Sequence, residues 1–251
     1  MKTRLLAVTA LLLFVPTAFW LTGWRWQGNE VPLNYLLYII TQTGGIPVAL
    51  FSTAALFALL YLAHRRGEGR ALLLVVLVSL GATQVGKSLL KPLIGEARPY
   101  VVVLTKDDPA RIRDFYAVKR SIRADAVRAY YAKSAAQTPP YLIAHRAKET
   151  GYSFPSGHTT FVASWALLFT GIIGFANRRR SLITGAVITW AMLVMASRVW
   201  LGMHYPIDLV GGVLLAGAIN LPLLLAWQQR HTSPRLQRLL KRLPAWRKSG
   251  N

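Results

Sequence analysis

Apolar residues in this chain gather in six long runs separated by short polar or charged connectors. Each run is close to the ~20 residues that an α-helix needs to cross the hydrocarbon core of a bilayer. The runs lie at residues 5–22, 45–63, 71–90, 158–176, 181–200 and 207–227. This pattern predicts an all-α fold built as a polytopic bundle of six transmembrane helices. Gly212 and Ala216, in the last run, are small residues of the kind that allow close packing between helices.

One connector, from about Arg98 to Ser153, is much longer than the others. Its segment 111–135, RIRDFYAVKRSIRADAVRAYYAKSA, is prone to form helix. We therefore expect a helical cap between the third and fourth spans. The segment fits a solvated amphipathic helix that covers the bundle, and equally an interfacial element that attracts anionic lipid headgroups. Its ragged apolar stripe consists of Ile112, Phe115, Ile122, Val127 and Tyr130.

The composition agrees with a membrane protein. Of 251 residues, 53% are hydrophobic, and the mean hydropathy is +0.36. The formal net charge of +21 would suggest a nucleic-acid-binding protein if the chain were soluble. Here the basic residues lie in the connectors, so we expect no nucleic-acid partner. With no cysteine, repeat or soluble domain, we expect one integral membrane domain over residues 1–251.

The short basic loops predict the orientation. Basic residues precede the first span, separate the second from the third and the fourth from the fifth, and fill a tail at 229–251. With six spans, all of these fall on one side, which the positive-inside rule assigns to the cytoplasm. Both termini are then cytoplasmic, and the connector 98–153 faces outward. In a bacterium this means the inner membrane, with the connector in the periplasm. We expect the first run to be an uncleaved helix rather than a signal peptide.

Three polar clusters lie at the outer ends of these spans. Residues 91–99 read KPLIGEARP, residues 155–158 read PSGH, and residues 197–208 read SRVWLGMHYPID. The predicted topology places all three at the same face. Ionisable residues at such a depth are costly, and they mark functional sites by default.

Side chains in these clusters suit a phosphate. Lys91, Arg98 and Arg198 supply three cations, and the two guanidinium groups match phosphate oxygens. Pro99 favours an extended backbone at Arg98, so we expect the chain to leave the third helix there. Ser156 is suited to be an N-cap and Gly157 allows close backbone approach, so their N–H groups form an anion site where the fourth helix begins.

Two histidines complete the predicted chemistry. His204 and Asp208 are four residues apart in the first turn of the sixth helix, where Pro206 is favourable. The carboxylate can hold the imidazole in one tautomer, so that His204 attacks phosphorus and forms a phosphohistidine. His158 protonates the leaving oxygen and then assists hydrolysis. This arrangement predicts phosphoryl transfer without a metal ion.

Taken together, the motifs K-x6-RP, PSGH and SR-x5-H-x3-D resemble the three signatures of the type 2 phosphatidic acid phosphatase (PAP2) superfamily. The resemblance implies a six-helix membrane phosphatase with a periplasmic site and no cofactor. It implies the same roles for His204, His158 and Asp208. It also implies that phospholipid and isoprenoid phosphates are the substrates: phosphatidylglycerol phosphate, phosphatidic acid, diacylglycerol pyrophosphate and undecaprenyl pyrophosphate. Membrane lipids are the expected partners, and no obligate protein partner is expected.

Two alternative functions stay open. A dedicated undecaprenyl pyrophosphate phosphatase, recycling a cell-wall lipid carrier, would need the same catalytic residues. A lipid-headgroup transporter or scramblase would spread charged residues along the depth of the bilayer. Here they gather at one end of the spans, which favours an enzyme.

Overall fold

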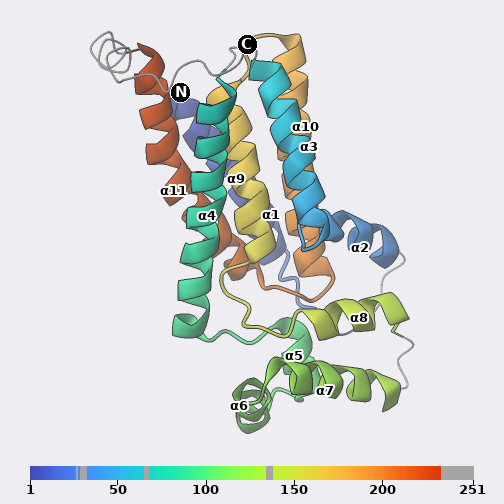
Figure 1. Ribbon diagram of the computed structural model, residues 1–251. Helices are drawn as coiled ribbons and strands as arrows, with labels where there is room; N and C mark the ends of the chain where they lie inside the picture. The colour runs from blue at the N-terminus through green and yellow to red at the C-terminus, as the bar shows by residue number, and fades with distance from the viewer. Residues whose placement is uncertain (27, 29–32, 65–67, 134–137, 233–251) are drawn as a thin grey trace, which may run out of the picture.

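The computed structural model describes residues 1–26, 28, 33–64, 68–133 and 138–232, and within these ranges every regular element is a helix (Figure 1). The prediction of an all-α fold is confirmed. Arg65 and Arg66 of a predicted basic loop and residues 233–251 of the predicted tail lie outside the described residues.

Six helices run side by side along one axis and form a bundle (Figure 1). Each overlaps one of the six predicted runs. They are α1 (Lys2–Leu21), α3 (Val48–His64), α4 (Gly69–Ile94), α9 (Gly157–Ile172), α10 (Arg178–Trp200) and α11 (Pro206–Thr232). Four of them, α1, α4, α10 and α11, are long and apolar enough to cross a membrane. The chain is therefore a membrane protein.

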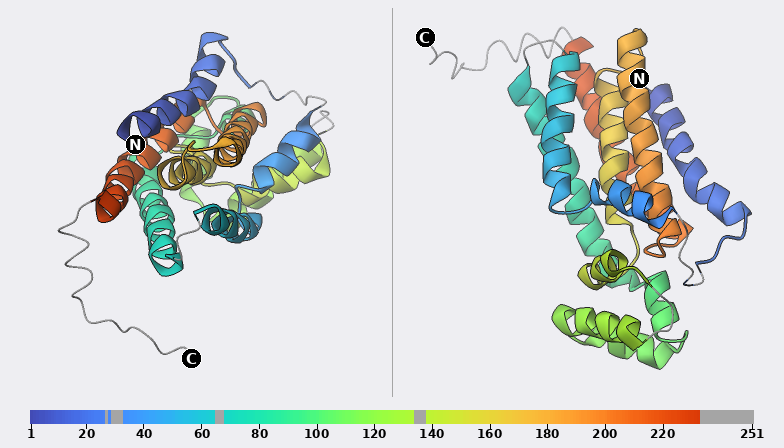
Figure 2. Two further views of the ribbon diagram at one scale, coloured as in Figure 1. Left: turned by 90° about the horizontal axis from the view of Figure 1, so that it is seen from above. Right: turned by 90° about the vertical axis from the view of Figure 1, so that its right-hand side faces the viewer.

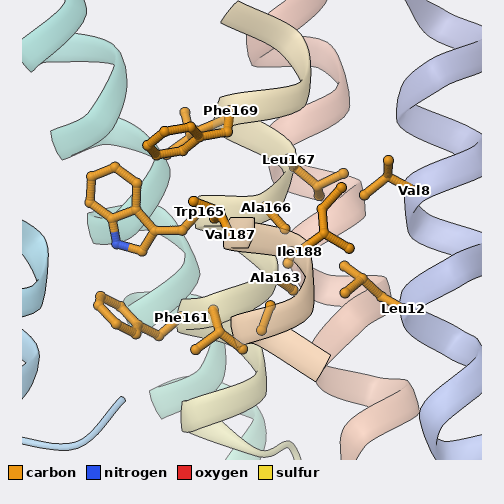
Figure 3. Packing of buried hydrophobic residues seen from close by; sticks show 14 of the residues in the cluster. Val8, Leu12, Phe161, Ala163, Trp165, Ala166, Leu167, Phe169, Val187 and Ile188 are labelled. Atoms are coloured by element: carbon orange, nitrogen blue, oxygen red, sulfur yellow. The ribbon is translucent and has the colours of Figure 1, made fainter. Parts of the chain in front are cut away.

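Helix α9 forms the centre of the bundle. It packs against α1, α4, α10 and α11, and every side chain from His158 to Thr170 is buried. Figure 3 shows the apolar packing, in which α9 side chains such as Ala163 and Leu167 lie close to Ile188 of α10, and Ile188 in turn lies beside Leu12 of α1. Polar groups at the start of α9 are therefore held in place by neighbours on several sides.

The predicted close packing at Gly212 is also confirmed. A Cβ atom at Gly212 would lie 2.9 Å from Thr159 Cβ and 3.0 Å from the carbonyl oxygen of Ser156. Contacts this short leave no room for a side chain, so the second turn of α11 rests directly on the start of α9.

The long connector folds into four helices at the end of the bundle opposite the N-terminus (Figure 1). These are α5 (Pro99–Leu104), α6 (Pro109–Ala117), α7 (Arg120–Lys133) and α8 (Pro140–Lys148). They share a second apolar core with the end of α10, formed by residues such as Phe115, Val127, Leu142 and Met203. The cap and the bundle therefore meet along a packed boundary.

The predicted single helical segment at 111–135 is wrong in one respect: it is two helices. The backbone at Val118 is extended, so α6 ends there and α7 begins at Arg120. The apolar stripe is divided accordingly. Phe115 and Val127 are buried in the cap, whereas Ile122 is 53% exposed.

A short helix that the apolar runs did not predict, α2 (Asn34–Gln42), lies crosswise to the bundle beside α10 (Figures 1 and 2). Its inner side buries Asn34 and Thr41, whereas Tyr35 and Leu36 are exposed. This helix delivers Thr41 and Gln42 to the end of the bundle that carries the three polar clusters.

Candidate active site

The three polar clusters meet at the cap end of the bundle, although they are far apart in sequence. Helix α4 ends there, α9 begins there, and the turn 201–205 joins α10 to α11 there (Figure 1). Ser156 is the N-cap of α9, and its hydroxyl accepts a hydrogen bond from the N–H of Thr159 at 3.3 Å. Helix α11 begins at Pro206. Both local predictions are confirmed.

Two glycines shape the approach to the site. The chain leaves the third span four residues before the predicted exit at Arg98: α4 ends at Ile94, because Gly95 takes a left-handed conformation with φ +67°. Arg98 itself is extended, as its neighbour Pro99 predicts. Gly202, with φ +70°, turns the chain after α10. The N–H groups of Met203 and His204 then donate to the carbonyl of Arg198.

His204 is held at both ring nitrogens. Nδ1 lies 3.1 Å from Asp208 Oδ2, and Arg98 Nη1 donates to Nε2 at 3.2 Å. Because a guanidinium group can only donate, the proton of the neutral imidazole lies on Nδ1, facing the carboxylate. Burial lowers the pKa of His204 well below its ordinary value, and the charge of Arg98 lowers the pKa further. Nε2 therefore carries no proton near neutral pH, and its lone pair accepts the hydrogen bond from Arg98.

The carboxylate of Asp208 is itself oriented by two donors. The backbone N–H of Tyr205 donates to Oδ2 at 2.8 Å, and the hydroxyl of Ser153 donates to the same oxygen. Ser153 also lies 3.1 Å from His204 Nδ1. The backbone carbonyl of Asp208 accepts from the N–H of Ser156. These bonds tie the His204–Asp208 pair to the start of α9.

Arg98 and Arg198 are both buried, with 5% and 0% of their surface exposed. Arg98 donates to the carbonyls of Gly151 at 2.8 Å and Met203 at 3.0 Å, in addition to His204. Arg198 donates to Thr41 Oγ1 at 2.9 Å and to Glu149 Oε2 at 2.5 Å. Both guanidinium planes are thus fixed before any ligand arrives.

His158 lies in the first turn of α9. Its Nε2 is 3.8 Å from Glu149 Oε1. Among the described residues neither His158 Nε2 nor Arg198 Nε has a hydrogen-bond partner, although both atoms are buried. These two atoms belong to side chains that both lie against Glu149, and unsatisfied polar atoms in such a place are suited to a polar ligand. Gly45 allows this placement, since a Cβ atom there would lie 2.8 Å from His158 Nε2.

The remaining predicted residues line the base of the site. Lys91 Nζ donates to the carbonyls of Tyr152 at 2.5 Å and Ser153 at 3.1 Å, and so braces the loop before α9. Gly157 packs against Lys87: a Cβ atom there would lie 2.9 Å from Lys87 Cδ. Lys91 therefore binds the carbonyl groups of this loop as well as being placed to bind a phosphate. Lys87 is a further cation close to the start of α9.

A cavity of about 760 Å³ adjoins His204. Phe19, Trp20 and Trp24 at the end of α1 form one wall, and Val102 and Val103 of α5 form another. Arg25, Glu96 and Asp107 also line the cavity, but most of its lining is aromatic or aliphatic, which suits a largely apolar molecule with a polar end.

Comparisons with known proteins show the family of the chain. Residues 72–233 match the sequence profile of the PAP2 superfamily. The chain belongs to the PAP2 superfamily. It is 39% identical over 227 residues to phosphatidylglycerophosphatase B of Haemophilus influenzae, which covers 88% of this chain and 93% of the relative.

Two other PAP2-related comparisons are more distant. The chain is 34% identical over 105 residues to an undecaprenyl-diphosphatase of Sulfolobus acidocaldarius, covering 41% of this chain and 46% of the relative. The solved structure of a transmembrane PAP2-type phosphatidylglycerolphosphate phosphatase of Bacillus subtilis aligns with 20% identity and a TM-score of 0.48, over 89% of this chain and 87% of that chain.

Beyond the PAP2 motifs, sequence reasoning missed several residues of the site. Ser153 and Glu149 precede the PSGH motif by two and six residues, and Thr41 comes from α2. His145 belonged to no motif, yet its Nε2 accepts from Arg198 Nη1 at 3.1 Å. Burial lowers the pKa of His145 to about 4. The only available signal was proximity to PSGH, which applies to Ser153 and Glu149 alone.

Proposed function

We propose that this chain is a lipid phosphate phosphatase that removes the terminal phosphate of phosphatidylglycerol phosphate. Its PAP2 membership and its similarity to phosphatidylglycerophosphatase B over most of both chains support a lipid phosphatase. The observation that carries the mechanism is the fixed tautomer of His204, set by Arg98 on one nitrogen and Asp208 on the other. We include phosphatidic acid, diacylglycerol pyrophosphate and undecaprenyl pyrophosphate as further substrates.

In the proposed reaction, His204 Nε2 attacks phosphorus in line with the leaving oxygen and forms a phosphohistidine. His158 donates a proton to that oxygen as the P–O bond breaks, and then takes a proton from the water that hydrolyses the intermediate. Asp208 stabilises the charge that develops on the His204 ring.

The phosphate oxygens are bound by Arg98, Arg198, the hydroxyl of Ser156 and the N–H group of Gly157, because the N–H of Ser156 already donates to the carbonyl of Asp208. Lys91 contributes positive charge from the base of the site. Buried cations shielded from water stabilise the pentacoordinate phosphorus, once Arg98 has exchanged its bond to His204 Nε2 for one to a phosphate oxygen. A metal ion or cofactor has no part in the proposal.

We further propose that all six bundle helices span the inner membrane of a bacterium, as one domain over residues 1–251. Helix α3, with 17 residues, is ~25 Å long and falls slightly short of the hydrocarbon core. Helix α9 is enclosed by its neighbours, so lipid does not dictate its composition. Both termini are cytoplasmic and the α5–α8 cap is periplasmic. The basic residues at 178–180 lie at the end of the bundle away from the cap, which supports this orientation (Figure 1).

The test is inorganic phosphate release from each purified lipid, with a chelator present, by the wild-type chain and by His204→Ala. We expect release by the wild type, with the fastest rate on phosphatidylglycerol phosphate, and none by His204→Ala. Undiminished release by His204→Ala would reject the assigned nucleophile. No release from any lipid by the wild type would favour the transporter class.

The second candidate is a dedicated undecaprenyl pyrophosphate phosphatase. The partial similarity to an undecaprenyl-diphosphatase favours it. The same assay separates the two, because a dedicated enzyme would release phosphate from the isoprenoid pyrophosphate and hardly at all from phosphatidylglycerol phosphate.

A further inference from the structure

The carboxylate of Glu149 lies at the centre of the candidate active site, surrounded by groups from several helices. Oε2 is 2.5 Å from Arg198 Nη2 and 3.4 Å from Arg98 Nη1. Oε1 is 3.7 Å from His145 Nε2 and 3.8 Å from His158 Nε2. Glu149 comes directly after α8, so the cap supplies this anion, and its partners come from both the cap and the bundle.

Three of these four groups, Arg98, Arg198 and His158, are the ones assigned to a phosphate. Guanidinium groups bind carboxylates and phosphates through the same paired N–H geometry. A carboxylate and a phosphoryl group therefore compete for the same donors, and their like charges repel at this distance. Both cannot occupy the site in this arrangement.

The surroundings explain why an internal anion is stabilising when no substrate is bound. Two buried guanidinium groups without a counter-charge are strongly unfavourable. Burial would raise the pKa of Glu149, but the charge of Arg198 and its neighbours lowers the pKa well below its ordinary value. The side chain is nevertheless 18% exposed, so rotation can carry the carboxylate towards solvent without unfolding the cap.

We propose that Glu149 is an internal competitor for the phosphate site. A ligand must displace its carboxylate, and only a doubly charged phosphate does so effectively. The proposal rests on the proposed function, since it takes phosphate to be the ligand of this site. A phosphomonoester carries a charge of about −1.5 to −2 at pH 7, more than the single charge of a carboxylate. A phosphodiester carries one negative charge, as the carboxylate does, so it is attracted to the guanidinium groups no more strongly than the carboxylate that it would replace. Glu149 thus keeps the phosphodiester headgroups of the surrounding bilayer out of the site.

The test uses the full chain purified in detergent and the isosteric variant Glu149→Gln, which removes the charge but not the shape. Binding of inorganic phosphate and of a soluble phosphodiester, glycerophosphoglycerol, is measured by calorimetry. We expect the variant to bind phosphate at least tenfold more tightly than the wild type, and to bind the phosphodiester measurably. We also expect the variant to melt at a lower temperature than the wild type when no phosphate is present. Added phosphate should raise the melting temperature of the variant by more than it raises that of the wild type.

The matched control is Asp125→Asn, which removes one carboxylate on α7 that pairs with Arg128 at the protein surface. It should bind both ligands as the wild type does. Phosphate affinity equal to or weaker than wild type in a folded Glu149→Gln protein would overturn the proposal, because that is the result if Glu149 merely positions Arg198.

If Glu149→Gln does not fold, Glu149→Asp provides the same test. Its carboxylate is one methylene shorter and reaches Arg198 less well, so phosphate should bind two- to fivefold more tightly, and weaker binding would overturn the proposal. Failure of the proposed function looks different. In that case the wild type binds no phosphate and releases none from lipid, whereas failure of this inference alone leaves wild-type phosphate release intact.

Discussion

Arg98 donates to His204 through Nη1 at 3.2 Å, on the ring nitrogen that faces away from Asp208. The contact brings the K-x6-RP motif and the SR-x5-H-x3-D motif together at one imidazole. It has two consequences: it leaves Nε2 without a proton, and it places a fixed positive charge beside the atom proposed to attack phosphorus.

The carboxylate of Asp208 should be needed for its charge and for its role as an acceptor. In Asp208→Asn, the amide can turn its NH2 group towards His204 Nδ1 and favour the tautomer with the proton on Nε2. We expect kcat to fall by about 10²–10⁴-fold with the fold retained. Phosphate release and circular dichroism measure the two effects. Asp114→Asn, on the exposed side of α6, is the control and should retain wild-type kcat.

The pH dependence should reflect the lowered pKa of His204. A protonated imidazole cannot attack phosphorus, and a lowered pKa means that the ring stays neutral as the pH falls through 6.5, the ordinary imidazole value. We therefore expect the acid limb of the kcat/KM profile to lie below pH ~6.5, after correction for the second ionisation of the substrate phosphate near 6. A limb centred at or above 6.5 would contradict the buried environment of His204.

Gly45 should be required because of the space it leaves for His158. In Gly45→Ala the new methyl group would lie 2.8 Å from His158 Nε2, so the ring must move. Since small misplacements of catalytic groups are costly, we expect kcat to fall about 10- to 100-fold without loss of stability. Gly185→Ala on α10 is the control, because nothing lies within 4 Å of its new Cβ atom. Equal activity of the two variants would place the general acid elsewhere.

His145 should make the stability of the protein depend on pH. Its pKa of about 4 in the folded chain is below the ordinary ~6.5 of an unfolded chain, so the unfolded state binds more protons between these values. The contribution of the neutral ring to the free energy of unfolding is therefore fully present above pH 6.5 and is lost as the pH falls towards 4. At pH 5 the free energy of unfolding is lower by ~2 kcal/mol.

The measurement is thermal unfolding in detergent at pH 7 and pH 5, for wild type and His145→Gln. The variant cannot titrate but keeps an acceptor for Arg198, so its melting temperature should fall less between the two pH values. If both proteins lose the same stability, His145 is not the group responsible.

Much of the bundle could be predicted from the sequence because the signals are local. An apolar run of about 20 residues has few stable arrangements other than a membrane helix. Ser156 as an N-cap and Pro206 at the start of α11 follow from the preferences of those residues for their own backbone positions. The prediction that His204 and Asp208 share the first turn of the sixth helix is wrong in one respect: His204 lies two residues before α11, and the turn at 201–205 brings its ring to Asp208.

Local signals were weaker in the connector. The break between α6 and α7 at Val118 and Lys119 falls within a segment of continuous helix-forming residues, and packing in the cap decides it. Helix α2 is short, and its polar residues Thr41 and Gln42 are as typical of a loop as of a helix. Its packing against α10 is visible only in the folded chain. Such short helices owe their stability to tertiary contacts rather than to propensity.

Residue type and spacing were thus enough to predict the helical class, the shared face of the three motifs and the candidate chemistry of the histidines and cations. The placement of Glu149 between Arg98 and Arg198, and of Ser153 against Asp208, depended on the folded chain. The physical reason is that an ion pair between residues 49 positions apart leaves no periodic trace in the sequence. Its geometry is set by how the cap packs on the bundle, not by the residues beside it in the chain.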